Sequence, residues 1–186
     1  MAELRFPEPP LADDVVLLRP WVEDDLSSRA AAFADPLLDR FSNPLTTGVT
    51  DADVRANFGR QGQARLRGEQ IDFALAVPSG PTLAGGGASL YDVDLEQGRA
   101  AVGFWLTPAF RGRGIATHAT RLLAGWAFGG LGVARLELTC APDNEASQRV
   151  ALRCGFVLEG ILRSHTLFKG TRRDTMVFSL LASDLA

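Results

Sequence analysis

The strongest hydrophobic pattern in the chain lies between residues 102 and 128. Val102, Phe104 and Leu106 alternate with positions that are also mostly apolar, which predicts a strand buried on both faces. Pro108 ends this strand, because proline has no amide hydrogen to donate to a neighbouring strand. After a short turn, apolar residues recur at helical spacing and predict a helix: Ala119, Leu122, Leu123, Trp126 and Ala127.

Similar patterns predict the other elements. Strands are predicted over residues 15–19, 71–77, 83–94, 99–106, 134–140, 157–168 and 171–181, and a hairpin turn at Lys169 and Gly170 joins the last two. Helices are predicted over residues 21–33, over 51–67 after a cap at Thr50 or Asp51, and again after Asn144. Turn chemistry interrupts the chain at Pro36 and at residues 43–44.

Three consecutive glycines, Gly85, Gly86 and Gly87, lie near the start of the predicted strand 83–94. Such a run can cradle a phosphate, but no helix follows to present its amides to an anion. We therefore interpret the three glycines as a bulge or as a close approach between backbones.

A basic, glycine-rich turn connects the strand ending at Leu106 to the following helix. It reads Arg-Gly-Arg-Gly-Ile-Ala from Arg111 to Ala116. The first amides of a helix are unpaired and carry a partial positive charge, and glycines let a ligand approach the backbone closely. The turn therefore predicts an anion site, most plausibly for a pyrophosphate. On these six residues alone, a solvated basic turn that caps the helix is an equally good interpretation.

Two other phosphate loops do not fit this turn. A Walker loop requires Gly-Lys-Ser/Thr, which the chain lacks. A dinucleotide fingerprint would place its third glycine at Thr117, and the next predicted strand ends in Thr139 and Cys140, with no acid to bind a ribose.

A second motif favours the functional interpretation. Asn144, Ser147, Ala151 and Cys154 share one helical face, and Gly155-Phe156 follows Asn144 at a spacing of eleven residues. Together with Arg-x-x-Gly-x-Ala at Arg111, Gly114 and Ala116, this pattern resembles the GNAT N-acetyltransferases. Ser147 and the tail residues Glu159-Gly160, Lys169-Gly170 and Asp174 resemble the RimJ/RimL-like branch, the ribosomal-protein N-terminal acetyltransferases.

The resemblance implies an α/β (α+β) GNAT fold in one domain, residues 1–186, with residues 1–10 as a loose arm. In that fold a central, mixed and mostly antiparallel sheet of six to seven strands is flanked by about four helices. The fourth and fifth strands, here residues 99–106 and 134–140, splay apart. The pantetheine arm of acetyl-CoA lies in this gap and pairs with strand backbone as an added strand would.

The resemblance also implies the residues that bind acetyl-CoA, the expected cosubstrate. Backbone groups near Phe104 and Leu106 would hold pantetheine, and Asn144 would open the helix beside it. The turn would bind the pyrophosphate through seven residues: Arg111, Gly112, Arg113, Gly114, Ile115, Ala116 and Thr117.

The catalytic groups implied by the resemblance are incomplete. Ser147 would contact the thiol of CoA and donate its proton. Many relatives carry a Tyr where this chain has Ala151 and a Glu where it has Ala101. The general base is left open between His165, Glu159, His118 and water, with Asp92 and Asp94 as further candidates.

Composition narrows the function classes. The chain has 186 residues, a net charge of −3 and 46% hydrophobic residues, which predicts a full core and no basic surface for nucleic acid. No apolar run reaches membrane-spanning length, and the N-terminus does not read as a signal peptide. Cys140 and Cys154 lie in apolar patterns and are expected to be reduced thiols of a cytoplasmic protein. Two histidines without paired Cys/His spacing predict no metal.

The reaction expected from the resemblance is acetyl transfer from acetyl-CoA to a primary amine in a ternary complex. An enzyme without an evident strong base acetylates an α-amine more easily than a lysine, because more of the α-amine is neutral at pH 7. The expected acceptor is therefore a protein or peptide N-terminus. The alternatives are a small-molecule amine (antibiotic, polyamine or amino acid) and a non-catalytic acyl-CoA-binding module. Phe41, Phe58 and Phe168 are candidate pocket residues for the acceptor, and the family often forms homodimers.

Overall fold

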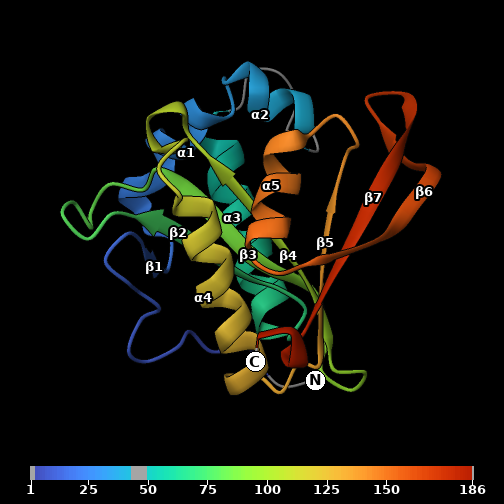
Figure 1. Ribbon diagram of the computed structural model, residues 1–186. Coiled ribbons are helices and arrows are strands. Elements are labelled where there is room, and N and C mark those ends of the chain that lie inside the picture. The colour runs from blue at the N-terminus through green and yellow to red at the C-terminus, as the bar shows by residue number, and fades with distance from the viewer. Residues whose placement is uncertain (1–2, 43–49, 186) are drawn as a thin grey trace.

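The computed structural model describes residues 3–42 and 50–185 and is built on a seven-stranded sheet (Figure 1). The strands are β1 (Leu17–Arg19), β2 (Ile71–Ala76), β3 (Gly86–Asp94), β4 (Arg99–Leu106), β5 (Arg135–Cys140), β6 (Val157–Phe168) and β7 (Thr171–Leu181). Their order in the sheet is β1-β2-β3-β4-β5-β7-β6, and only β4 and β5 run parallel. The predicted mixed, mostly antiparallel sheet is confirmed.

Five α-helices flank the sheet in the described part of the chain. They are α1 (Leu26–Ala32), α2 (Pro36–Phe41), α3 (Asp51–Leu66), α4 (Ile115–Gly130) and α5 (Glu145–Arg153). In Figure 1, α4 and α5 lie in front of the sheet, and α3 lies behind it. Ile115, Ala119 and Leu123 form the buried stripe of α4 and belong to the main core. No helix within residues 3–42 or 50–185 combines the length and apolarity needed to cross a membrane.

The two parallel strands separate soon after they begin to pair. The β4–β5 ladder runs only from Arg99–Arg135 to Ala101–Glu137. Beyond it, β4 continues to Leu106 while paired with β3, and β5 continues to Cys140 while paired with β7. The predicted splay is confirmed, and the facing edges of β4 and β5 can pair with an extended ligand.

The interruption predicted at Pro36 lies between two helices, because α1 ends at Ala32 and Pro36 begins α2, a helix that the sequence analysis did not predict. Proline fits the first turn of a helix, where the missing amide hydrogen would have no partner. Asp35 caps this helix, and its Oδ1 accepts a hydrogen bond from the Leu37 amide at 2.8 Å. The turn predicted at residues 43–44 lies outside the described residues.

Several predicted boundaries also move. The helix predicted over 21–33 is a short 3-10 turn (Glu23–Asp25) followed by α1, and the first strand is shorter than predicted. Residues 83–85 precede β3, which begins at Gly86. The second predicted helix, the final hairpin and the cap at Thr50 are confirmed.

The glycine run marks a close approach between backbones, as predicted. A Cβ at Gly85 would lie 2.1 Å from the Phe110 ring, and one at Gly86 would lie 2.5 Å from the carbonyl oxygen of Trp105. The pairing of β3 with β4 is regular here, and its irregularity lies between Tyr91 and Asp94 instead. The run therefore lets β4 and its following turn pack directly on β3.

Candidate active site

The glycine-rich turn places unpaired amides at the start of α4. Gly114 caps the helix in the left-handed conformation, with φ of +79°, and Gly112 has φ of +72°. The first intrahelical hydrogen bond runs from the His118 amide to the Gly114 carbonyl at 3.0 Å. The amides of Ile115 and Thr117 precede this bond and have no partner within the helix. A Cβ at Gly112 would meet no atom within 4 Å, so there is room above the turn for a bulky anion.

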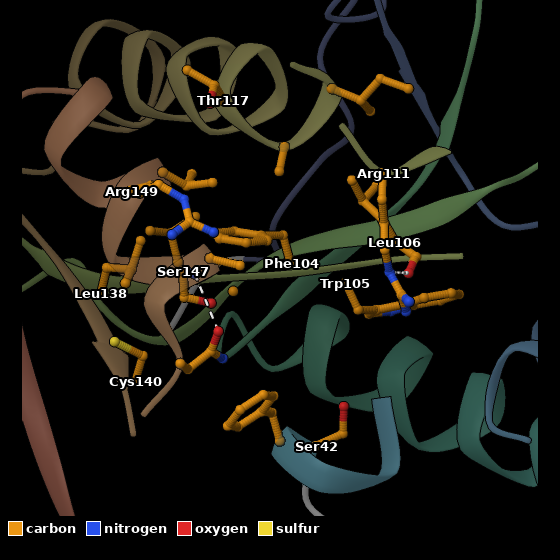
Figure 2. A pocket seen from close by; sticks show the side chains of 18 of the residues that line it. Ser42, Phe104, Trp105, Leu106, Arg111, Thr117, Leu138, Cys140, Ser147 and Arg149 are labelled. Atoms are coloured by element: carbon orange, nitrogen blue, oxygen red, sulfur yellow. Dashed lines mark hydrogen bonds between the residues drawn. The ribbon is translucent and has the colours of Figure 1, made fainter. Parts of the chain in front are cut away.

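A cavity of about 520 Å³ joins this turn to the gap between β4 and β5 (Figure 2). All the residues predicted to bind acetyl-CoA line it except Arg113. In Figure 2, Ser147, Phe104 and Cys140 lie on one side and Trp105 and Arg111 on the other. The volume falls in the range of ordinary ligand sites.

The two arginines of the turn, both predicted to bind the anion, already contact other groups of the protein. Arg113 lies over the Phe110 ring, 5.7 Å from its centre, and does not line the cavity. Arg111 lines the cavity, but its Nε donates to the Leu106 carbonyl at 3.0 Å and its Nη2 donates to Asp35. Arg111 therefore ties α2 to the turn, and the backbone amides are left as the main anion donors.

Two cations that the sequence analysis missed lie on α5. Arg149 and Arg153 line the cavity one helical turn apart. Arg149 also pairs with Glu145 at 3.2 Å on the exposed helix face. Their i, i+4 spacing after Asn144 was the available signal. They place positive charge at the wall of the first cavity.

Ser147 lies in the first turn of α5 at the wall of the cavity. Asn144 caps this helix, and its Oδ1 accepts a hydrogen bond from the Ser147 amide at 3.2 Å (Figure 2). The cap fixes the position of Ser147 beside the gap. The adjacent Cys140 thiol stays protonated, because burial raises its pKa to about 11.

Tyr91, the only tyrosine of the chain, also lines this cavity and was missed. It lies on β3 opposite Ala101, and its side chain is hydrogen-bonded to Thr139. Burial raises the pKa of its phenol, so the phenol keeps its proton at neutral pH. Tyr91 is a second proton donor in the cavity beside Ser147.

Glu159 cannot serve as the base. It forms an ion pair with Arg135 at 2.6 Å and accepts a hydrogen bond from Ser179. The Arg135 guanidinium, helped by the Ser179 hydroxyl, lowers the pKa of Glu159 to about 2. A carboxylate this acidic does not remove a proton from an amine at neutral pH.

The histidines and the other two acids predicted as bases lie outside the cavity. His165 is exposed on β6, with Nδ1 3.2 Å from the hydroxyl of Thr175. His118 Nδ1 lies 2.7 Å from Asp13 Oδ2. Asp92 is an exposed residue of β3, and Asp94 pairs with Arg99 at 3.6 Å.

One group of side chains near α4 has the composition of a metal site. Ligand atoms of Asp13, Asp14 and His118 lie within 4.8 Å of one another. The group lies at the partly exposed surface and lines neither cavity described in this section.

A second cavity of about 400 Å³ shares Ser42, Gly103, Phe104 and Trp105 with the first. Aromatic rings form one wall: Trp21 stacks on Trp105 with centroids 5.9 Å apart, and Phe33 packs on Trp105 at 6.0 Å. This wall suits an apolar part of a ligand.

Among the aromatic residues predicted for the acceptor, Phe41 lines the first cavity. Phe58 packs on Trp21 at 5.6 Å behind the wall of the second cavity, and Phe168 is buried away from both cavities.

The second cavity contains a carboxyl group that the sequence analysis missed. Asp72, on β2, accepts hydrogen bonds from Gln61 and Gln70. Burial raises the pKa of Asp72 to about 6, although these hydrogen bonds and the nearby Arg29 favour its charged form. An acid inside the otherwise apolar stretch of residues 71–77 was the available signal. Arg29 lies over the Trp21 ring at 4.6 Å and is almost fully buried.

The geometry defines a class of protein before any comparison is made. An amide-rich helix start, a gap between parallel strands and a second cavity beyond the gap are arranged for an extended anionic carrier that delivers a group to a separate acceptor. This arrangement is typical of acyl-CoA-dependent transferases.

Comparison with known proteins identifies the family. The model of the acetyltransferase (GNAT) domain matches residues 16–157, so the chain belongs to the GNAT acetyltransferase family and is an N-acetyltransferase. It is 37% identical over 93 residues to YdaF of Bacillus subtilis (strain 168), which is provisionally named a ribosomal N-acetyltransferase. It is 31% identical over 80 residues to the ribosomal-protein-serine acetyltransferase of Escherichia coli (strain K12).

These two matches cover 50% and 43% of this chain and 51% and 45% of the relatives, so they span about half of each protein. The fold itself matches RimJ of Mycobacterium smegmatis, solved in complex with CoA-disulfide, with a TM-score of 0.82 at 23% identity over 91% of this chain and 83% of that one. The predicted GNAT family and fold are confirmed, and the relatives are consistent with the RimJ/RimL-like branch.

Proposed function

We propose that the protein transfers the acetyl group of acetyl-CoA to the N-terminal α-amine of a protein or peptide. The observation that carries this proposal is that the two cavities share lining residues on β4, beside the gap. One cavity begins at the unpaired amides of α4, the other ends at Asp72, and both are lined by Gly103, Phe104 and Trp105. A carrier and an acceptor can therefore meet at the same three residues.

The residues of the first cavity fit a CoA thioester. The amides from Gly112 to Thr117 would bind its diphosphate, with Arg149 and Arg153 adding charge. The unpaired edge of β4 from Val102 to Leu106 would bind the pantetheine arm as a strand. These contacts would aim the thioester carbonyl at the second cavity.

In this arrangement the acceptor amine attacks the thioester directly. The amine nitrogen forms a bond to the thioester carbon, the carbon–sulfur bond breaks, and the departing thiolate takes a proton. Ser147 lies on the carrier side of the gap and is the donor that we favour, with Tyr91 as the second hydroxyl group in the cavity.

Three features favour an α-amine as acceptor. At pH 7 roughly a tenth of α-amino groups are neutral, against well under a thousandth of lysine amines. The carboxyl group in the second cavity, with a pKa raised to about 6, is a much weaker base than a lysine amine. Relatives of the chain carry names of ribosomal-protein acetyltransferases.

A pair of peptides of identical sequence tests the proposal. One has a free N-terminus and an acetylated lysine, and the other has an acetylated N-terminus and a free lysine. Mass spectrometry after incubation with acetyl-CoA should show acetylation of the first peptide only. Transfer only to the second peptide, or only to small amines, would overturn the acceptor assignment. If none of the acceptors gave any release of CoA from acetyl-CoA, catalysis itself would be rejected.

A further inference from the structure

The proposed transfer needs a group that removes the proton of the acceptor nitrogen, and the bases expected from the sequence line neither cavity. We propose that Asp72 is this general base and that its carboxylate accepts the proton, directly or through one water, from within the second cavity. The inference rests on the proposed function, because it concerns the proton balance of the same transfer.

The sheet aligns Asp72 with the gap. Asp72 on β2 lies opposite Ser89 on β3, and Ser89 lies opposite Gly103 on β4. Neighbouring strands are spaced by about 4.8 Å, so the Cα atoms of Asp72 and Gly103 are roughly 10 Å apart on one row. All three residues line the second cavity. A carboxylate, a bridging water molecule and an amine, arranged in line, can span a distance of this length.

Gly103 keeps this row open. A Cβ at Gly103 would lie 3.2 Å from the Tyr91 ring and 3.6 Å from Ser89 Oγ. Gly103 therefore adds no side chain at the point where the two cavities share lining residues. The neighbouring Phe104 and Trp105 line both cavities.

Neutral groups hold the carboxylate in place. Gln61 Nε2 donates to Oδ1 at 2.8 Å, and Gln70 Nε2 donates to Oδ1 at 3.0 Å and to Oδ2 at 2.9 Å. Gln61 Oε1 in turn accepts from Arg29 Nη1 at 3.1 Å, so one amide links the cation to the acid. Asp72 takes part in no ion pair within 4.0 Å among the residues that the structure describes. Its negative charge is oriented without being neutralised.

The surroundings of Asp72 give it useful basicity. Arg29 on α1, Gln61 on α3, Gln70 just before β2 and Ser89 on β3 surround the carboxyl group, and Arg29 is the charged member of this set. Burial outweighs the attraction of Arg29 and raises the pKa of Asp72 to about 6. At pH 7 the group is mostly ionised and is still a much better proton acceptor than an ordinary aspartate.

The proton balance of the step then closes. The nitrogen–carbon bond forms as the nitrogen loses its proton to the Asp72 carboxylate. The carbon–sulfur bond breaks, the thiolate takes a proton from a hydroxyl group of the first cavity, and that hydroxyl group regains a proton from solvent before the next turnover. Asp72 returns its proton to solvent after the acetylated product leaves.

The variant Asp72→Asn tests the role with little change of shape, and the exposed Asp24→Asn removes the same charge elsewhere. The acceptor is whichever amine the wild-type enzyme acetylates. Asp72→Asn should lower kcat at pH 7 by 100-fold or more, with both KM values and the affinity for CoA within about threefold. Asp24→Asn should match the wild type.

The pH profile separates a base from a structural residue. In the wild-type enzyme, log kcat/KM for an α-amine acceptor should rise with a slope of two below about pH 6, where both Asp72 and the amine titrate, and of one up to about pH 8. Asp72→Asn should show a slope of one throughout. An unchanged kcat, an unchanged slope of two, or a loss confined to KM would overturn the role of Asp72. Transfer to lysine alone would refute the proposed acceptor and still allow this test.

Discussion

Replacing Asp72 by Asn should stabilise the fold increasingly as the pH rises. The folded state raises the pKa of Asp72 from 3.8 to about 6, so between these values the folded protein binds more protons at this site than the unfolded chain. Stability then falls as pH increases through the window, and the full loss is present above about pH 6. Asparagine has no charge at any pH and does not contribute this loss.

The size of the effect follows from the shift. A shift of about two units at about 1.4 kcal/mol per unit gives roughly 3 kcal/mol. The free energy of unfolding of Asp72→Asn, relative to the wild type, should therefore increase by about 2 kcal/mol between pH 4 and pH 7, because a small part of the full effect is already present at pH 4. Constant differences between the two side chains, including the effect of the exchange on Arg29, cancel in this change.

Urea unfolding of the wild type and of Asp72→Asn at several pH values measures this difference in the free energy of unfolding. Carboxyl groups with a lowered pKa, such as Glu159, reduce the stability of both proteins equally at low pH, so their contribution cancels in the difference. The exposed Asp24→Asn should run parallel to the wild type. If Asp72→Asn instead loses stability relative to the wild type as pH rises, the charged form is favoured in the fold, and Asp72 is an ion-pair partner of Arg29 and not a base.

Three further outcomes are expected. Ser147→Ala should lower kcat by at least tenfold with little change in CoA affinity if its hydroxyl protonates the thiolate, whereas an equal loss of affinity would make it a binding residue. Gly114→Ala should cost about 1–2 kcal/mol in unfolding free energy and weaken CoA binding by calorimetry, because Gly114 has φ of +79°, while Gly125→Ala within α4 should not weaken it. Cys140 and Cys154 should react with iodoacetamide far more slowly than free cysteine at pH 8, because burial raises both pKa values to about 11, leaving about a thousandth as thiolate; rapid labelling of the native protein would contradict this burial.

The regular elements could be predicted where local pattern and tertiary packing agree. The apolar run of β4 and the stripe of α4 both belong to the core, and the final hairpin follows its turn residues. Pro36 shows the opposite case. A proline is equally compatible with a break in the chain and with the first turn of a helix. The helix starts here because Asp35 caps it through the Leu37 amide while Arg111 holds the Asp35 carboxylate in place, and this second contact could not be predicted from the sequence.

The two cavities differ in how much of them the sequence could reveal. The carrier site is largely one contiguous segment, the turn before α4, and its glycines carry a recognisable conformational demand. Its charge could not be placed, because Arg111 is occupied by Asp35, a residue 76 positions away. The second cavity draws one to three residues from each of α1, α3, β2, β3 and β4, and no local pattern connects them.

The position of Asp72 also accounts for Ala101, where many relatives carry a glutamate. Ala101 lies opposite Tyr91, at the end of the β4–β5 ladder and two residues before Gly103. Ala101 and Gly103 lie on the same face of β4, so a carboxylate at residue 101 would reach the gap from β4 itself. Here that face carries an alanine and a glycine, and the row through Ser89 brings a carboxylate from β2 to the same opening. The proposed base would therefore reach the opening beside Phe104 from β2, two strands across the sheet from β4.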